Sequence, residues 1–219
     1  MKFFIDSANL AEIRTAWDLG ILDGVTTNPT LIAKEGIKGV QNILNHYKNI
    51  CEIVKEGDIS AEVISTDYDE MIQEAVTLSK IHKNIVVKIP MTTEGLKAIS
   101  YLNKQGIPTN CTLVFSPGQA ILAAKAGATY VSPFIGRLDD VSFDGIELIK
   151  QIKTIFNQSK FNTQILAASI RHVVHIVKCA EIGVDVVTCP LSVILGLLKH
   201  PLTDIGLKRF LDDYKNSQV

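Results

Sequence analysis

Residues 84–90 read Asn-Ile-Val-Val-Lys-Ile-Pro, an apolar, β-branched run with a single cation, Lys88. Runs of this kind are typical of strands in a parallel sheet that is covered on both faces. Burying an ammonium group in such a strand is costly unless the group is paired or gives up its proton. A lysine that gives up its proton there is a nucleophile toward carbonyl groups and can form a Schiff base. The alternative is that Lys88 ends the strand with its head in water.

Short apolar runs of the same kind recur eight times, and stretches with helical periodicity separate them. The expected strands are residues 2–6, 24–28, 59–64, 84–89, 108–113, 129–134, 164–169 and 185–188. The expected helices are residues 10–19, 37–54, 68–81, 95–103, 117–126, 145–155, 173–182, 191–199 and 203–214. Several of them end at a glycine, as at Gly20 and Gly183. This alternation predicts an α/β protein with a closed (β/α)8 barrel, or TIM barrel. No G-x-G-x-x-G motif follows the first strand, which disfavours a doubly wound sheet.

The barrel is expected to form one domain over residues 1–219, since barrels commonly exceed about 200 residues as one unit. The helix expected at about residues 203–214 is an addition to the barrel. Its apolar stripe of Leu207, Leu211 and Tyr214 must pack on something, either its own barrel or a neighbouring copy.

Composition argues against several classes of partner. The formal net charge is −1, which provides no basic surface for nucleic acid, and no basic amphipathic or membrane-length apolar segment suggests a membrane partner. The chain opens directly on a strand-like run, so we expect no leader. Four cysteines without metal-ligand spacing indicate reduced thiols and a cytoplasmic protein: Cys51, Cys111, Cys179 and Cys189. His172 and His175 are expected on a solvated helix face, and no metal site is expected.

Polar residues gather at the C-terminal ends of the expected strands, where barrels hold their active sites. They are Asp6, Asn28, Glu62, Lys88, Asn110, Thr112, Ser132 and Ser169. One such residue alone is usually a turn former or a helix cap, but seven strands that aim polar groups at one mouth favour a catalytic Lys88. Cys111 lies between Asn110 and Thr112 and faces the opposite way, so it is a packing residue.

Several strings resemble one family, the transaldolases, in the short single-barrel branch that also contains the fructose-6-phosphate aldolases. They are residues 4–8 (FIDSA), 24–31 (GVTTNPTL), 87–90 (VKIP), 110–116 (NCTLVFS), 132–137 (SPFIGR) and 168–171 (ASIR). The resemblance runs from Phe4 to about Pro201, nearly the whole chain.

The resemblance implies a catalytic role for four residues. Lys88 would form a Schiff base with a ketose phosphate, and Asp6 would be the acid/base for the bond between the third and fourth carbons. Glu62 and Thr112 would hold a water for the proton transfers. A satisfied buried hydrogen bond is the alternative reading of these two residues.

The resemblance also implies the binding residues. Asn28, Asn110 and Ser132 would hold the three-carbon dihydroxyacetone unit. A phosphate site would comprise Arg137, Ser169 and Arg171. The alternative for either arginine is a surface ion pair, for which Asp139 and Asp140 are nearby partners in the case of Arg137.

Two positions separate the branches of the family. The aldolase members carry glutamine in place of Glu62 and tyrosine in place of Phe134, so this chain resembles the transaldolases. The implied function is transfer of a dihydroxyacetone unit from sedoheptulose 7-phosphate to glyceraldehyde 3-phosphate in the pentose phosphate pathway, with no cofactor. The alternatives are a fructose-6-phosphate aldolase and a non-catalytic sugar-phosphate-binding barrel. The resemblance further implies a homo-oligomer, a decamer of two pentameric rings.

Overall fold

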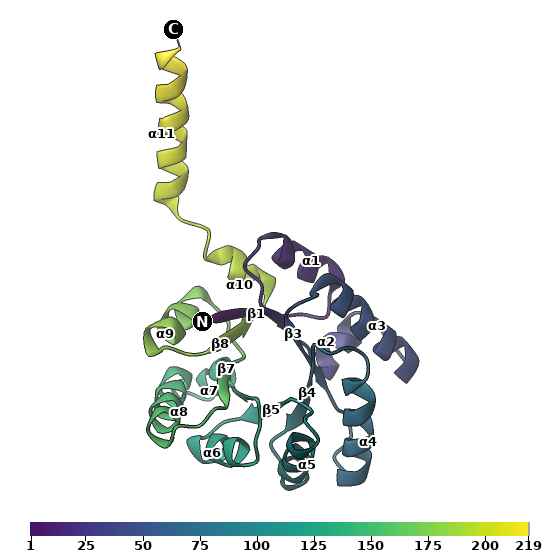
Figure 1. Cartoon of the computed structure of the whole chain (residues 1–219). Helices are drawn as coiled ribbons and strands as arrows, with labels where there is room; N and C mark the ends of the chain where they lie inside the picture. Colours follow the sequence, from purple (N-terminus) through teal and green to yellow (C-terminus); the bar gives the residue numbers. More distant parts are fainter. Residues whose placement is uncertain (219) are drawn as a thin grey trace.

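Parallel strands close into a barrel in chain order, and the last strand pairs with the first (Figure 1). The computed structural model describes residues 1–218, and within them the strands are β1 (Lys2–Asp6), β2 (Gly24–Thr26), β3 (Asp58–Glu62), β4 (Ile85–Pro90), β5 (Thr109–Val114), β6 (Tyr130–Pro133), β7 (Gln164–Ala167) and β8 (Val186–Cys189). The expected (β/α)8 barrel is confirmed. Val219, the last residue of the expected domain, lies outside the described part of the chain.

Helices surround the ring of strands, except for the last one, which extends away from it (Figure 1). They are α1 (Leu10–Asp18), α2 (Pro29–Lys34), α3 (Val40–Ile53), α4 (Tyr68–Ser79), α5 (Thr93–Lys104), α6 (Pro117–Lys125), α7 (Ile135–Asp139), α8 (Gly145–Ser159), α9 (Val173–Ile182), α10 (Leu191–Gly196) and α11 (Pro201–Ser217). None of these helices is both long and apolar enough to cross a membrane, a finding that covers residues 1–218.

Local sequence signals set many helix boundaries. Asp67, Thr92 and Ser116 cap α4, α5 and α6 with side-chain oxygens that accept from backbone N–H groups of the first turn. At the other end of α1 and α9, Gly20 and Gly183 adopt φ angles of 71° and 78°, the left-handed region in which glycine is least strained. These two helix stops were expected from the sequence, and they are confirmed.

The buried apolar side chains form two clusters, one outside the ring of strands and one inside it. The large outer core lies between the strands and the helices and includes Ile5, Val87 and Cys111. A smaller cluster fills the interior of the barrel, and its members are Phe4, Val86, Tyr130, Leu166, Ala168 and Val186. Phe4 and Val86 lie two residues before Asp6 and Lys88, so alternation places the polar side chains one layer above an apolar floor.

Two short helices were not expected from the sequence. The strand expected at 24–28 ends at Thr26, and Asn28 is the N-cap of α2. Similarly, Phe134 is the N-cap of α7, and Ser169 lies beyond the end of β7. The expected strand bounds were wrong at these three positions because the chain turns into a loop or helix as soon as it leaves the barrel.

The C-terminal helix α11 projects away from the barrel (Figure 1). It is longer at both ends than the expected 203–214, and none of its residues is buried. The apolar stripe is exposed, as at Leu207, Leu211 and Tyr214. Packing of this helix on its own barrel, one of the two expected arrangements, is therefore wrong.

Candidate active site

Lys88 is a buried cation on β4, with 5% of its surface exposed. Its Nζ donates a hydrogen bond to the carbonyl oxygen of Thr27 at 2.9 Å and lies 3.0 Å from Oε2 of Glu62. The alternative in which Lys88 holds its head in water is therefore wrong. Glu62 is the direct neighbour of Lys88 in the register of β3 and β4, so strand pairing itself brings the amine and the carboxylate together.

Seven of the expected site residues line one cavity of about 100 Å³ at the C-terminal ends of the strands. They are Asp6, Asn28, Lys88, Ser132, Phe134, Arg137 and Ser169. The cavity is lined by both a buried amine and an arginine, which suits an anionic substrate with a reactive carbonyl.

Four expected residues lie outside the lining of this cavity, and two of them bond directly to lining residues. Asn110 accepts from Ser132 Oγ at 2.8 Å and donates to Ser60 Oγ at 3.1 Å. Glu62 pairs with Lys88, as described above. The arrangement fixes the amide of Asn110 and the carboxylate of Glu62 behind the groups that face the cavity.

Thr112, the third of these residues, has a buried hydroxyl. Its Oγ1 has no hydrogen-bond partner among residues 1–218. Leaving a buried hydroxyl without a hydrogen-bond partner costs free energy. A threonine hydroxyl can both donate and accept, so a small polar molecule such as water could satisfy Thr112 in both ways. The reading of Thr112 as a satisfied buried hydrogen bond is wrong.

Two threonines of the site were missed at the level of sequence. Thr26 donates from its hydroxyl to Asp6 Oδ1 at 2.7 Å, and its oxygen also lies 2.7 Å from Thr188 Oγ1. Both threonines line the cavity. Strand alternation could have predicted both residues. Thr26 lies two residues before Asn28 and so faces the same way, and Thr188 lies on the one expected strand to which no polar site residue was assigned.

Asn28 both lines the cavity and caps a helix. Its Oδ1 accepts from the N–H of Leu31 at 3.0 Å, in the first turn of α2. The cap fixes the side-chain oxygen and leaves the amide N–H groups of Asn28 as the donors available to a ligand.

The expected phosphate residues lie on α7 and on the loop after β7. The guanidinium of Arg137 lies over the ring of Phe134, 5.0 Å from its centroid, and Ser169 adopts a left-handed φ of 57°. Arg171 is half-exposed and makes a bidentate pair with Asp140, with Nη1 2.8 Å from Oδ1. The surface ion pair, which was the alternative for either arginine, is thus formed by Arg171.

The pair of histidines also differs from expectation. His175 is buried, and its Nε2 lies 3.1 Å from Asp139 Oδ2. His172 is the N-cap of α9, and its ring lies against that of His175 with centroids 3.7 Å apart. Burial is the main cause that lowers the pKa of His175, and the positive potential of His172 adds to it. A solvated helix face is therefore wrong for His175.

The cysteines are packing residues. Cys51, Cys111, Cys179 and Cys189 are all buried and free. Burial raises the pKa of the Cys111 thiol to about 12, so it has little thiolate at neutral pH, and the prediction that it packs rather than reacts is confirmed. Within residues 1–218, no group of three or more His, Cys, Asp or Glu side chains could hold a metal ion. Metal independence stays a prediction.

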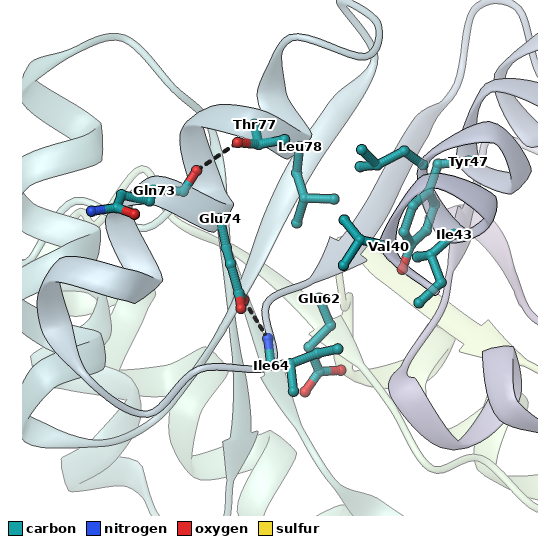
Figure 2. Close-up of a pocket in the computed structure, with 10 residues that line it drawn as sticks. Val40, Ile43, Tyr47, Glu62, Ile64, Gln73, Glu74, Thr77 and Leu78 are labelled. Carbon is teal, nitrogen blue, oxygen red and sulfur yellow. Dashed lines mark hydrogen bonds between the residues drawn. The ribbon is translucent and has the colours of Figure 1, made fainter. Parts of the chain in front are cut away.

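A second, larger cavity of about 240 Å³ lies between α3 and α4, on the outer side of Glu62. Figure 2 shows Val40, Ile43 and Tyr47 facing Leu78 across it, with Glu62 and Ile64 at one end. Glu74 holds this end by accepting from the N–H of Ile64 at 2.7 Å. The lining is mainly apolar and offers no cluster of catalytic groups, so the smaller cavity at Lys88 is the candidate active site.

The fold and this site define a class of protein: (β/α)8 barrels with a buried, carboxylate-paired lysine at the C-terminal mouth. Comparison with known proteins narrows the class. The model of the family described as Transaldolase/Fructose-6-phosphate aldolase matches residues 3–218. A protein of Cytophaga hutchinsonii named "Probable transaldolase" is 65% identical over 215 residues, which cover 98% of both chains. Proteins of the same name from Flavobacterium psychrophilum and Porphyromonas gingivalis are 64% and 62% identical over 98% of this chain, and the match covers 98% and 97% of their own lengths.

This chain belongs to the transaldolase/fructose-6-phosphate aldolase family. The match of its full length to the proteins named above confirms the resemblance that the sequence strings indicated.

Proposed function

We propose that this protein is a transaldolase that moves a dihydroxyacetone unit from sedoheptulose 7-phosphate to glyceraldehyde 3-phosphate, as a step of the pentose phosphate pathway. The observation that carries this proposal is the contact of Glu62 with Lys88, which lines one cavity together with Asp6 and Arg137. The high identity to proteins named "Probable transaldolase" supports the same activity.

In this proposal Lys88 is the nucleophile. Transfer of its proton to Glu62, 3.0 Å away, frees the amine to add to the ketone carbon of the donor. Loss of the former carbonyl oxygen as water then gives the iminium. Glu62 and the unpartnered hydroxyl of Thr112 are the groups that hold and move this water and its protons.

Asp6 is the acid/base for carbon–carbon cleavage. Its carboxylate takes the proton of the hydroxyl on the fourth carbon, the bond between the third and fourth carbons breaks, and its electrons move into the iminium. The aldose product leaves, and a three-carbon enamine stays on Lys88. The hydroxyl of Thr26 donates to Asp6 Oδ1 and orients this carboxylate toward the cavity.

The remaining residues bind the substrate. Asn28 and Ser132, with Asn110 bonded to Ser132 from behind, hold the hydroxyl groups of the three-carbon unit, and Phe134 forms an apolar wall beside it. The phosphate group of donor or acceptor binds Arg137, Ser169 and Arg171, because guanidinium groups form paired hydrogen bonds with phosphate oxygens. Phosphate must then compete with Asp140 for Arg171, since these two side chains are paired in the structure.

Fructose-6-phosphate aldolase is the second candidate, because the matched family includes both activities by description. Glu62 and Phe134 favour transfer over release. A carboxylate at position 62 can act as a base toward the bound water, and phenylalanine at 134 has no hydroxyl to donate a proton to the enamine. A non-catalytic sugar-phosphate-binding barrel is the third candidate, and the buried Lys88–Glu62 pair argues against it.

An assay with fructose 6-phosphate, with and without erythrose 4-phosphate, tests the proposal. We expect sedoheptulose 7-phosphate and glyceraldehyde 3-phosphate to form when the acceptor is present, and little free dihydroxyacetone to form without it. Brisk release of dihydroxyacetone without acceptor would establish the aldolase instead. Absence of turnover, and of any adduct after borohydride treatment, would establish the non-catalytic reading.

We also propose a cytoplasmic homo-oligomer, a decamer of two pentameric rings, in which each chain forms one domain over residues 1–219. The exposed apolar side chains of α11, such as Ile205 and Phe210, support self-association, because an isolated helix of this length is only marginally stable in water. Light scattering of the full chain tests this proposal. A decameric mass is expected, and a monomeric mass at micromolar concentration would contradict it.

A further inference from the structure

The candidate phosphate residues depend on two segments with little regular structure of their own. Helix α7 comprises only five residues and carries Arg137. The loop between β7 and α9 carries Ser169 and Arg171. A single helical turn is unstable in isolation, so contacts between these segments and their surroundings must fix where the two arginines lie.

Backbone hydrogen bonds make the first connection between the segments. The N–H of Ile135 donates to Ala168 O at 2.9 Å, and the N–H of Gly136 donates to Ser169 O, also at 2.9 Å. A Cβ on Gly136 would lie only 2.7 Å from Nε of Arg171. The side chain of Arg171 therefore crosses α7 at its glycine to reach Asp140.

The buried ring of His175 makes the second connection. Its Nε2 lies 3.1 Å from Asp139 Oδ2, at the end of α7, and its Nδ1 accepts from the backbone N–H of Arg171 at 3.4 Å. The other oxygen of Asp139 accepts from the N–H of Gly145 at 3.0 Å, at the start of α8. Both contacts of the ring require a neutral imidazole with its proton on Nε2.

We propose that His175 and Asp139 are positioning residues for phosphate recognition, which hold the backbone of Arg171 against α7 so that substrates with a phosphate group bind tightly. The proposal rests on the proposed function. Neither residue lines the active-site cavity. Their loss should therefore weaken the binding of phosphorylated sugars without affecting the chemistry at Lys88.

The test compares two substrate pairs in the full-length protein. Fructose 6-phosphate with erythrose 4-phosphate uses the phosphate site, whereas dihydroxyacetone with glyceraldehyde does not. In His175→Leu we expect KM for fructose 6-phosphate to rise about tenfold, because the loss of one hydrogen bond to a positioned group has about that effect on affinity. The value of kcat should stay within about twofold of that of the wild type. The unphosphorylated pair should keep its kcat/KM.

Two further variants separate positioning from a structural role. His175→Gln can still donate an amide proton to Asp139, so it should recover most of the lost affinity. In Asp139→Asn the side-chain amide can place an N–H group opposite the Nε2–H of His175, so two donors face each other. If the ring then moves its proton to Nδ1 so that Nε2 can accept, Nδ1 can no longer accept from the backbone N–H of Arg171. KM for fructose 6-phosphate should therefore rise again.

Inorganic phosphate provides a readout that does not depend on turnover. Its dissociation constant, measured by calorimetry, should rise about tenfold in His175→Leu, and Asp139→Asn provides the same measurement if His175→Leu does not fold. Equal losses with both substrate pairs, or unchanged phosphate affinity in a folded variant, would overturn the proposal. If wild-type protein turns over neither pair but binds phosphate in a manner that depends on His175, the proposed function fails and the positioning role remains.

Discussion

The two sides of the active-site mouth are built differently. On one side, Lys88 and Glu62 come from adjacent paired strands and are nearly enclosed by protein. On the other side, Arg171 comes from a loop, is 48% exposed at its side chain and pairs with Asp140, which is 51% exposed. Strand register in the barrel fixes the relative position of Lys88 and Glu62, whereas contacts between a loop and a short helix fix that of Arg171 and Asp140.

This difference fits the two tasks of the proposed reaction. Covalent chemistry benefits from groups that are held in place before substrate arrives and are shielded from water. Phosphate binding instead needs groups that can exchange one anionic partner for another. An exposed ion pair contributes at most about 1 kcal/mol, so phosphate can displace Asp140 from Arg171 at small cost.

The largest expected effect is on the buried side. Lys88→Met should reduce transaldolase activity on the order of 10⁴-fold or more, because removing a nucleophile removes the covalent route itself. Fructose 6-phosphate with borohydride should leave a reduced three-carbon adduct on Lys88 of the wild-type protein, located by peptide mapping. Lys97→Met is the matched control, since this lysine is exposed and pairs with Glu94 on a helix surface. An adduct on any other lysine would contradict the assignment.

The second prediction changes the proton chemistry at the buried side. Glu62→Gln removes the base beside Lys88 and should lower dihydroxyacetone transfer about 10²-fold. Phe134→Tyr adds a hydroxyl to a ring that lines the cavity, so alone or with Glu62→Gln it should raise release of free dihydroxyacetone from fructose 6-phosphate. Product identification with and without erythrose 4-phosphate measures both effects. Unchanged release in Phe134→Tyr and in the double variant would mean that these positions do not separate the two activities.

The third prediction concerns the exposed side. Arg171→Ala should raise KM for phosphorylated substrates about ten- to a hundredfold, because it removes a charge-assisted contact to the phosphate. KM for dihydroxyacetone as donor should change far less. Asp140→Asn is the matched control, because it removes only the competing partner, and KM should change by less than about fivefold. Steady-state kinetics with both donors measure the difference. Equal losses with both donors in Arg171→Ala would assign this arginine to structure.

The sequence predicted the buried side better than the exposed side, for a physical reason. The repeating apolar pattern places Lys88 and Glu62 at the ends of neighbouring strands, and the register of β3 and β4 then makes them direct neighbours. The ion pair of Arg171 joins residues that are 31 positions apart, through a loop and a helix of five residues. No periodic pattern encodes that contact, so the sequence did not single out Arg171 as the partner of Asp140.

Helix α9 shows a second limit of sequence patterns. A hydrophobic pattern places valines inside and histidines outside, yet Val174 and Val177 are 54% and 48% exposed while His175 is buried. The carboxylate of Asp139 and the N–H of Arg171 satisfy the ring, and both partners come from outside the helix. A polar residue with tertiary partners can thus take a core position that an apolar neighbour would be expected to hold.

The smallest expected effect is a pH dependence of stability that His175 contributes on the phosphate side of the site. Burial lowers the pKa of His175 below its ordinary 6.5, and the charged groups that face the ring are His172, Asp139 and Arg171. The unfolded chain therefore binds a proton more readily than the folded one, so stability from this group is fully present above pH 6.5 and is lost as pH falls through the folded pKa. The free energy of unfolding cannot change by more than about 1.4 kcal/mol per pH unit through the binding of one proton. Chemical denaturation from pH 7.5 to 5 should show a steeper loss in the wild type than in His175→Gln, which has no titrating ring. Parallel curves for the two proteins would mean that protonation of His175 does not affect the stability of the fold.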